Sequence, residues 1–278
     1  MTPRSPLIDT DGAAALIEPL TRYVAQAAAA ILAVDRSGMG LQDKIDGSPV
    51  TEADLAADRI LADGLARLVP EIPAVSEERL ARAMPPYDNS FFLIDPLDGT
   101  REFVAGRSEF TVNLALVNNG TPLLGIIAAP ALGLIWRGLV GRGAERLSIG
   151  GRGAGAQAMK AEPIHTRPFP PSGQPWIAAV SRSHGDSQTD SFIDARPGAV
   201  RQTLGSSIKF TAVAEGTIDI YPRLAPTHEW DVAAGHAIVT AAGGKVTDGF
   251  GTDLRFGGGM RDFIVPAFIA WGDASQAR

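Results

Sequence analysis

Two aspartates close together in the chain are the residues best suited to do chemistry, in the segment 95–100 that reads DPLDGT. Residues 91–94 are all hydrophobic, so Asp95 lies at the end of a predicted buried strand, where α/β enzymes hold their ligands. Gly99 lets the backbone approach a ligand closely, and Thr100 begins a predicted helix whose free N–H groups suit a phosphate. Because Mg²⁺ takes oxygen ligands together with substrate phosphate, the segment predicts a magnesium and phosphate site.

Each acidic motif also has an ordinary structural interpretation. Asp-Pro and Asp-Gly pairs form turns, and Thr51 with Asp54 three residues later fits a helix cap. Glu77 belongs to a pair of adjacent acids after an apolar stretch, which is typical of a solvated loop. Asp231 begins a predicted helix, which is typical of an N-cap. Taken together, however, five acids stand at the start of a helix or the end of a strand: Asp54, Glu77, Asp95, Asp98 and Asp231.

Hydrophobic spacing predicts the elements that position these acids. Helical periodicity and caps predict helices at residues 16–32, 51–69, 207–214 and 231–242. Short apolar or alternating runs predict strands at residues 91–94, 110–116, 123–128, 176–180, 217–221 and 263–271. Two helices followed by a hairpin favour an α+β first half, and alternating strands and helices favour an α/β second half.

The predicted domain junction lies where glycine and proline are dense. Glycines accumulate between residues 138 and 155, and five prolines lie between 163 and 175. We expect an N-terminal α+β domain over residues 1–160, which carries most of the acids. A C-terminal α/β domain over residues 161–278 would carry Asp231.

Composition and charge narrow the function classes. The chain has 278 residues, 45% hydrophobic and 20% charged, as in ordinary globular proteins. It has no cysteine, which excludes thiol nucleophiles, thiolate metal sites and disulfides. A formal charge of −6 without a long basic run argues against a nucleic acid polymer as partner. Neither a signal peptide nor an apolar stretch able to span a bilayer is visible, so we expect a cytoplasmic protein without an integral membrane span.

Two segments together resemble the signature motifs of the inositol monophosphatase superfamily. They are residues 95–100, DPLDGT, and residues 230–235, WDVAAG. The superfamily comprises Mg²⁺-dependent, lithium-sensitive phosphatases with a layered fold. The resemblance covers almost the whole chain and implies an α/β protein, an αβαβα sandwich of the inositol monophosphatase and fructose bisphosphatase type. It also implies that the site lies in the cleft between the two domains.

Within the superfamily the chain looks like the CysQ-type 3′(2′),5′-bisphosphate nucleotidases. Residues 44–54, KIDGSPVTEAD, match the pattern K-x-D-x-S-P-V-T-x-x-D of that branch, and residues 205–210, GSSIKF, look like it too. Residues 181–184, 221–223 and 226–231 point the same way. This resemblance implies hydrolysis of the 3′-phosphate of 3′-phosphoadenosine 5′-phosphate to AMP and phosphate, which recycles a by-product of sulfate assimilation.

The resemblance also implies roles for individual residues. The implied ligands of two or three Mg²⁺ ions are Glu77, Asp95, the carbonyl of Leu97, Asp98, Asp231 and, at a weaker position, Asp54. Asp54 and Thr100 would orient and deprotonate a metal-activated water, so that no phosphoenzyme forms. The implied substrate contacts are Gly99 and Thr100 for the scissile phosphate, Lys209 and Arg223 for the second phosphate, and His184 and Ser206 nearby.

Two other functions stay open at this stage. One is an inositol monophosphatase or broader sugar-phosphate phosphatase that uses the same metal site, although Lys209 suits a second phosphate better. The other is a binding module without turnover, which the presence of all the expected acids and of Thr100 disfavours. The partner implied is a small phosphate ester such as adenosine bisphosphate. The resemblance leaves open a homodimer, since relatives include monomers and dimers, and also contact with the inner face of a membrane.

Overall fold

A computed structural model describes residues 5–35, 42–43, 49–82, 89–149, 160–183, 185–257 and 263–277. Its larger sheet has the strand order β3-β4-β5-β6-β7-β8-β9. These strands are β3 (Ala74–Ser76), β4 (Ser90–Asp98), β5 (Thr111–Asn118), β6 (Thr121–Ala129), β7 (Leu134–Leu139), β8 (Gly143–Ser148) and β9 (Ala161–Ile164). The pair β3 and β4 is parallel, and the other neighbours are antiparallel.

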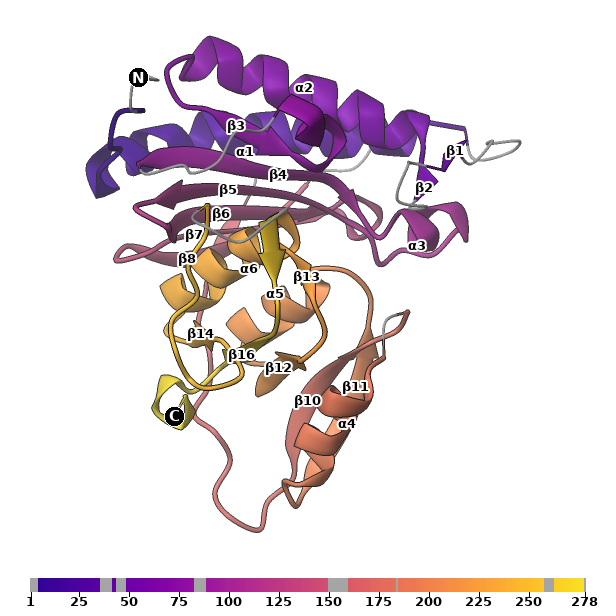
Figure 1. The fold of residues 1–278 in the computed structure, drawn as a ribbon, viewed down its shortest axis with the longest axis vertical. Coiled ribbons are helices and arrows are strands. Elements are labelled where there is room, and N and C mark those ends of the chain that lie inside the picture. Colours follow the sequence, from indigo (N-terminus) through magenta and orange to yellow (C-terminus); the bar gives the residue numbers. More distant parts are fainter. Residues whose placement is uncertain are drawn as a thin grey trace.

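Helices cover both faces of this sheet (Figure 1). The long helices α1 (Thr10–Ala33) and α2 (Glu52–Leu68) lie on one face, and α6 (Glu229–Ala241) lies on the other with α5 (Ile208–Ala214) packed beside it. Successive residues of β4 point to opposite faces, so Phe92 packs with α1 and α2 while Phe91 packs with α6. Burial on both faces explains the continuous hydrophobic run in this strand.

The smaller sheet has the strand order β11-β10-β12-β16-β14 and completes the layers. Its strands are β10 (Trp176–Ser181), β11 (Ala199–Leu204), β12 (Ile220–Arg223), β14 (Lys245–Thr247) and β16 (Phe268–Trp271). One face contacts α5 and α6 through Tyr221 and Phe268, and the other contacts α4 (Ser187–Asp194) through Trp271. The order of layers is therefore αβαβα, as predicted.

Short elements complete the described chain. They are β1 (Gln42–Asp43) paired with β2 (Pro49–Val50), β13 (Thr227–His228) paired with β15 (Ile264–Val265), the helix α3 (Thr100–Val104), and the 3₁₀ turns η1 (Glu77–Arg82), η2 (Pro130–Leu132) and η4 (Ala274–Gln276). Close packing joins the two halves. A Cβ atom on Gly138 of β7 would lie 2.8 Å from the Cα of Ile238, so glycine there lets α6 lie directly on the sheet.

Most predicted elements are confirmed, with three differences. The strand predicted at 91–94 continues to Asp98, with a register shift between Asp95 and Asp98 instead of a simple turn. The strand predicted at 217–221 lies at Ile220–Arg223. The strand predicted at 263–271 is divided into β15 and β16 around Pro266, because proline has no N–H to donate to a neighbouring strand.

The glycine-rich middle of the chain is more regular than its composition indicated. Residues 134–139 and 143–148 form β7 and β8, which the sequence patterns did not predict. Strand β9, at residues 161–164, pairs with β8, so the larger sheet continues past the predicted boundary at residue 160. A division into two domains stays a prediction.

Candidate active site

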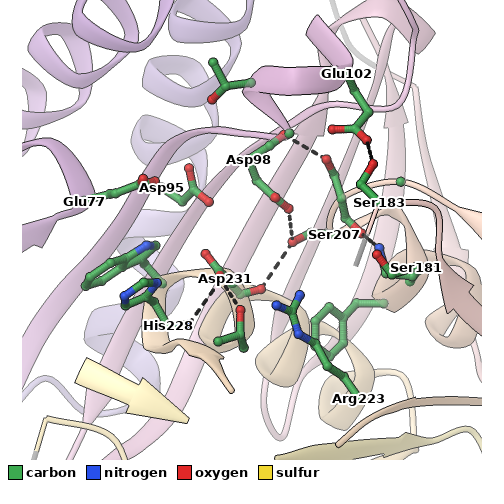
Figure 2. A pocket seen from close by; sticks show the side chains of 18 of the residues that line it. Glu77, Asp95, Asp98, Glu102, Ser181, Ser183, Ser207, Arg223, His228 and Asp231 are labelled. Carbon is green, nitrogen blue, oxygen red and sulfur yellow. Dashed lines mark hydrogen bonds between the residues drawn. The ribbon is translucent and has the colours of Figure 1, made fainter. Parts of the chain in front are cut away.

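A cavity of about 340 Å³ opens between the two sheets, where β4 ends and α6 begins (Figure 2). Both halves of the sequence contribute to its walls. The acidic side chains Glu77, Asp95, Asp98 and Asp231 form what we call the acidic wall. The cationic side chains Lys209 and Arg223 form what we call the basic wall. Leu97, Gly99, Thr100 and Ser206 also line the cavity, so it brings together most of the residues that the sequence singled out.

The sheet geometry explains how the acidic wall forms. Strands β3 and β4 run parallel, so Glu77, which directly follows β3, lies at the same edge as Asp95 and Asp98 at the end of β4. The register shift after Asp95, where Pro96 cannot donate a ladder hydrogen bond, turns the strand end toward the cavity. Asp231 reaches the same cavity from the first turn of α6.

Each aspartate of the acidic wall has one oxygen fixed by hydrogen bonds. Oδ1 of Asp95 accepts from the backbone N–H of Leu97 at 3.1 Å. Oδ2 of Asp231 accepts from the backbone N–H of His228 at 3.2 Å and from the hydroxyl of Thr227.

Asp98 also has one carboxylate oxygen fixed by hydrogen bonds. Its Oδ2 accepts from the hydroxyls of Ser207 at 2.9 Å and Thr111 at 3.3 Å. No described residue donates a hydrogen bond to the other oxygen of Asp95, Asp98 or Asp231. Each carboxylate therefore keeps one oxygen available as a ligand.

The acidic wall concentrates negative charge in a buried place. Asp95 is only 1% exposed, and burial raises its pKa well above the usual range, helped by the neighbouring carboxylates of Glu77, Asp98, Asp231 and Asp54. Burial, followed by the charge of Asp98, raises the pKa of Asp231 to about 6. In the described ranges, no ion pair includes Asp95, Asp98 or Asp231.

This donor set fits a divalent metal ion. All the groups are oxygen donors, several are carboxylates without a cation partner among the described residues, and Mg²⁺ prefers such ligands. In the part of the chain that the structure describes, no three acidic or histidine side chains lie close enough together to hold a metal ion as they stand. Mutual repulsion of the carboxylates gives a physical reason for that spacing.

Asp54 and Thr100 lie together, as the sequence predicted. The hydroxyl Oγ1 of Thr100 lies 3.1 Å from Oδ1 of Asp54 and 3.1 Å from the carbonyl of Leu97. Asp54 is fixed on its other side by a capping box, because its Oδ2 accepts from the N–H of Thr51 at 2.8 Å. It is 2% exposed, and burial raises the pKa of its carboxyl.

The basic wall uses its cations differently. The ammonium of Lys209 is 3% exposed and donates to the backbone carbonyls of Ser206 at 2.6 Å and Leu204 at 3.4 Å. Burial lowers the pKa of Lys209 to about 8. The guanidinium of Arg223 donates through Nη2 to the carbonyl of Pro226 at 3.3 Å. Its Nε is buried and has no hydrogen-bond partner among the described residues.

Ser206 holds a strained turn in place beside the acidic wall. Its φ of +47° is left-handed, and its hydroxyl lies 2.8 Å from the carbonyl of Asp98 and 3.0 Å from that of Glu109. Gly99, with φ +91°, faces this hydroxyl so closely that a Cβ there would collide with it. His184, which the sequence placed near the second phosphate, lies outside the described residues.

Sequence reasoning missed two acids that hold the halves together. Glu102, 4% exposed, accepts a hydrogen bond from the hydroxyl of Ser183. Glu109 forms an ion pair with Arg182 at 2.8 Å and accepts from the N–H of Gly205 at 3.1 Å. Neither acid stands in a motif, so no local signal in the sequence identified them.

His228 also lines the cavity, although no sequence pattern predicted a role for it. Its ring stacks on Trp230, with centroids 4.5 Å apart and planes inclined by 7°. Trp230 is 2% exposed and belongs to the core. Both residues lie in the segment 226–231 that carried part of the resemblance, so this segment was the available signal.

The αβαβα layers, with a carboxylate-rich cavity at the strand ends, fit a phosphatase. The family model described as "Inositol monophosphatase family" matches residues 14–274, and the chain belongs to that family. The predicted resemblance is therefore confirmed. No helix within the described ranges is long and apolar enough to cross a membrane.

Similar proteins sharpen this placement. The chain is 37% identical over 236 residues to the 3′(2′),5′-bisphosphate nucleotidase CysQ of Escherichia coli K12, covering 83% of this chain and 88% of that protein. It is 38% identical over 226 residues to the CysQ of Salmonella typhimurium LT2, covering 81% and 86%. A crystal structure of CysQ from Bacteroides thetaiotaomicron matches with a TM-score of 0.74 and 33% identity, over 91% of this chain and 96% of that one.

Proposed function

We propose that this phosphatase hydrolyses the 3′-phosphate of 3′-phosphoadenosine 5′-phosphate, giving AMP and phosphate. The observation that carries the proposal is the basic wall opposite the acidic wall. Arg223 has a buried Nε without a partner among the described residues, and a guanidinium can bind a phosphate through two parallel hydrogen bonds. A substrate with two phosphates would engage both walls at once. Similarity to the CysQ nucleotidases also supports it.

The acidic wall would hold two or three Mg²⁺ ions through Glu77, Asp95, Asp98, Asp231 and the carbonyl of Leu97. Asp54 would contribute to a weaker position. When bound, Mg²⁺ lowers the pKa of a water and neutralises charge on the phosphoryl oxygens. The oxygens of Asp95, Asp98 and Asp231 that no described residue occupies are the ones that would face the ions. Lithium sensitivity is part of this proposal.

Asp54 and Thr100 would orient the attacking water and remove its proton. The hydroxyl of Thr100 can accept from the water while it donates to Oδ1 of Asp54, 3.1 Å away. The raised pKa of Asp54 suits a general base, because it favours proton uptake. Water would attack phosphorus directly while the bond from phosphorus to the 3′-oxygen breaks, and that oxygen would leave with AMP and take up a proton, so no phosphoenzyme is required. The backbone N–H groups of Gly99 and Thr100 would bind the scissile phosphate.

Lys209 and Arg223 would bind the second phosphate, with Ser206 and His184 beside it. Because the ammonium of Lys209 already donates to two backbone carbonyls, it would act mainly through its charge and its remaining donor. A cytoplasmic location, contact with a membrane surface and the choice between a monomer and a homodimer stay predictions from the sequence.

Phosphate release in the presence of Mg²⁺ tests the proposal. We would compare 3′-phosphoadenosine 5′-phosphate with inositol 1-phosphate at matched concentrations, with and without lithium. Strong preference for the nucleotide, abolished by lithium, is the expected result. Preference for the inositol ester would favour the alternative, a sugar-phosphate phosphatase that uses the same acidic wall, and would remove the nucleotide assignment.

The variant Lys209→Ala separates the two substrates. Loss of a charged hydrogen-bond partner costs about 1.5–3 kcal/mol, or roughly 10- to 100-fold in kcat/KM for the bisphosphate. Activity on the monophosphate should change much less. An equal loss on both substrates would remove Lys209 from the second-phosphate site.

A further inference from the structure

Ser207, to which the sequence analysis assigned no role, contacts both sides of the acidic wall (Figure 2). Its side chain is buried, and the residue is 3% exposed. The hydroxyl Oγ lies 2.9 Å from Oδ2 of Asp98, 3.0 Å from Nδ2 of Asn113 and 3.3 Å from the backbone carbonyl of Asp231. It therefore touches one proposed metal ligand from β4 and the backbone of another from α6.

The chemistry of these groups fixes the direction of the hydrogen bonds. An ionised carboxylate and a backbone carbonyl both only accept, so the single hydrogen of the Ser207 hydroxyl points to Oδ2 of Asp98, the nearer of its two acceptors. The amide nitrogen of Asn113 only donates, so Ser207 accepts from it. The result is a short directed chain from Asn113 through Ser207 to Asp98, in which each bond polarises the next.

Asn113 has no other side-chain task among the described residues. It is 1% exposed, and its Oδ1 is buried without a hydrogen-bond partner in the described part of the chain. A buried amide oxygen without a hydrogen bond costs free energy. Its presence here therefore indicates that the remaining bond of this amide, from Nδ2 to Ser207, has a role. Its position on β5, directly opposite Asp95 in the ladder, places it beneath the acidic wall.

Contacts within the protein hold the turn that carries Ser207 in place without any ion. The preceding residue, Ser206, is bound to the carbonyls of Asp98 and Glu109 at 2.8 and 3.0 Å. Ser207 itself is the residue from which α5 begins. The turn is thus attached to the end of β4 both through the backbone of Asp98 and through its carboxylate.

We propose that Ser207, supported by Asn113, is a positioning residue that orients Asp98 for Mg²⁺ and sets its place relative to Asp231. By fixing Oδ2, Ser207 leaves Oδ1 directed for coordination. The inference rests on the metal site of the proposed function. Groups that orient metal ligands in this way typically contribute 10- to 100-fold to metal affinity.

The test measures Mg²⁺ binding calorimetrically, without substrate, so that it does not depend on which ester is hydrolysed. Ser207→Ala should weaken Mg²⁺ binding by about 10-fold or more. The matched control is Thr211→Val on the same helix, which removes a buried hydroxyl bound to the carbonyl of Ile208 at 3.0 Å, away from the cavity. The control should bind Mg²⁺ as the wild type does.

Two further variants keep the inference testable if Ser207→Ala does not fold. Asn113→Ala should weaken Mg²⁺ binding in the same direction, and Ser207→Thr, which keeps the hydroxyl, should bind Mg²⁺ more tightly than Asn113→Ala. When both alanine variants fold, their effects should not add in the double variant, because the two residues act through one chain of bonds.

Two results would overturn the inference. One is unchanged Mg²⁺ affinity in the folded alanine variants, and the other is an equal loss in Thr211→Val, which would indicate a general packing effect. A wild-type protein that binds no Mg²⁺ would instead overturn the proposed metal site, and this inference with it. Wild-type Mg²⁺ binding with no nucleotide hydrolysis would refute the proposed substrate and leave the positioning role standing.

Discussion

The charged groups on the two walls of the cavity differ in the neighbours that surround them. On the acidic wall, Asp95 and Asp231 face other carboxylates, and their pKa values are raised. On the basic wall, Lys209 is satisfied by the carbonyls of Leu204 and Ser206. In the described chain, Asp95, Asp98 and Asp231 thus have no ion-pair partner, whereas on the basic wall Lys209 has hydrogen-bond partners and the buried Nε of Arg223 has none. The difference supports the proposal that the acidic wall would supply the chemistry, through bound cations, and that the basic wall would select the substrate.

The largest expected effect tests the acidic wall. Asp95→Asn should lower Mg²⁺-dependent activity by about 10³-fold, because it removes a proposed ligand and metal stabilisation of the transition state contributes several kcal/mol. The same variant should raise the stability of the metal-free protein at pH 7, because it removes a buried charge among carboxylates. Steady-state kinetics and thermal unfolding measure the two effects.

A buried aspartate outside the cavity is the matched control. Asp219 is 1% exposed and forms an ion pair with Arg167 at 2.7 Å. Asp219→Asn should lower stability and retain Mg²⁺-dependent activity. Full activity in Asp95→Asn would remove the metal assignment of the acidic wall.

An intermediate effect tests the basic wall. Arg223→Lys keeps the charge but loses the planar fork, so kcat/KM for the bisphosphate should fall roughly 10- to 100-fold. Activity on inositol 1-phosphate should change little. Arg201→Lys, on β11 and paired with Asp194 at 2.9 Å, is the control and should leave both activities unchanged. A uniform loss on both substrates would contradict a selective role for Arg223.

A smaller effect follows from the pKa of Lys209, which burial lowers to about 8. Above pH 8 the ammonium loses its proton, so KM for the bisphosphate should rise, by up to about tenfold per pH unit.

The unfolded chain keeps the ordinary pKa of 10.5 for Lys209 and therefore binds more protons than the folded chain between pH 8 and 10.5. The contribution of Lys209 to the free energy of unfolding should therefore rise over that range. Lys209→Met should remove both trends, and their persistence in that variant would assign them to another group.

The smallest effect concerns stability. Because the pKa of Asp231 is raised from 3.8 to about 6, the folded state binds more protons than the unfolded state between these values. The contribution of Asp231 to stability in the metal-free protein should therefore fall as pH rises from about 4 to 6. Added Mg²⁺ should stabilise more at pH 7.5 than at pH 5, by a few degrees in Tm, because fewer protons compete. A comparison of Tm values with Asp231→Asn checks the assignment. A Mg²⁺ effect that is greater at pH 5 would contradict it.

The sequence by itself determined the parts of this protein that depend on local pattern. Helical periodicity located α1 and α2, an aspartate typical of a helix start located α6, and a run of apolar residues located β4. The identity of the acids of the acidic wall followed from short motifs and the family resemblance, and so did the pairing of Asp54 with Thr100. Such signals are local because periodicity reports which face of one element is buried.

Only the tertiary structure decided which partners these residues have. Ser207 and Asp98 are 109 positions apart in the chain, and their hydrogen bond exists because the fold brings the start of α5 to the end of β4. Sequence patterns also failed to predict the carbonyl partners of Lys209, the strands β7 and β8, and the ion pair of Glu109 with Arg182. Which residues become hydrogen-bond partners depends on how whole layers pack together. No short segment of the sequence contains that information.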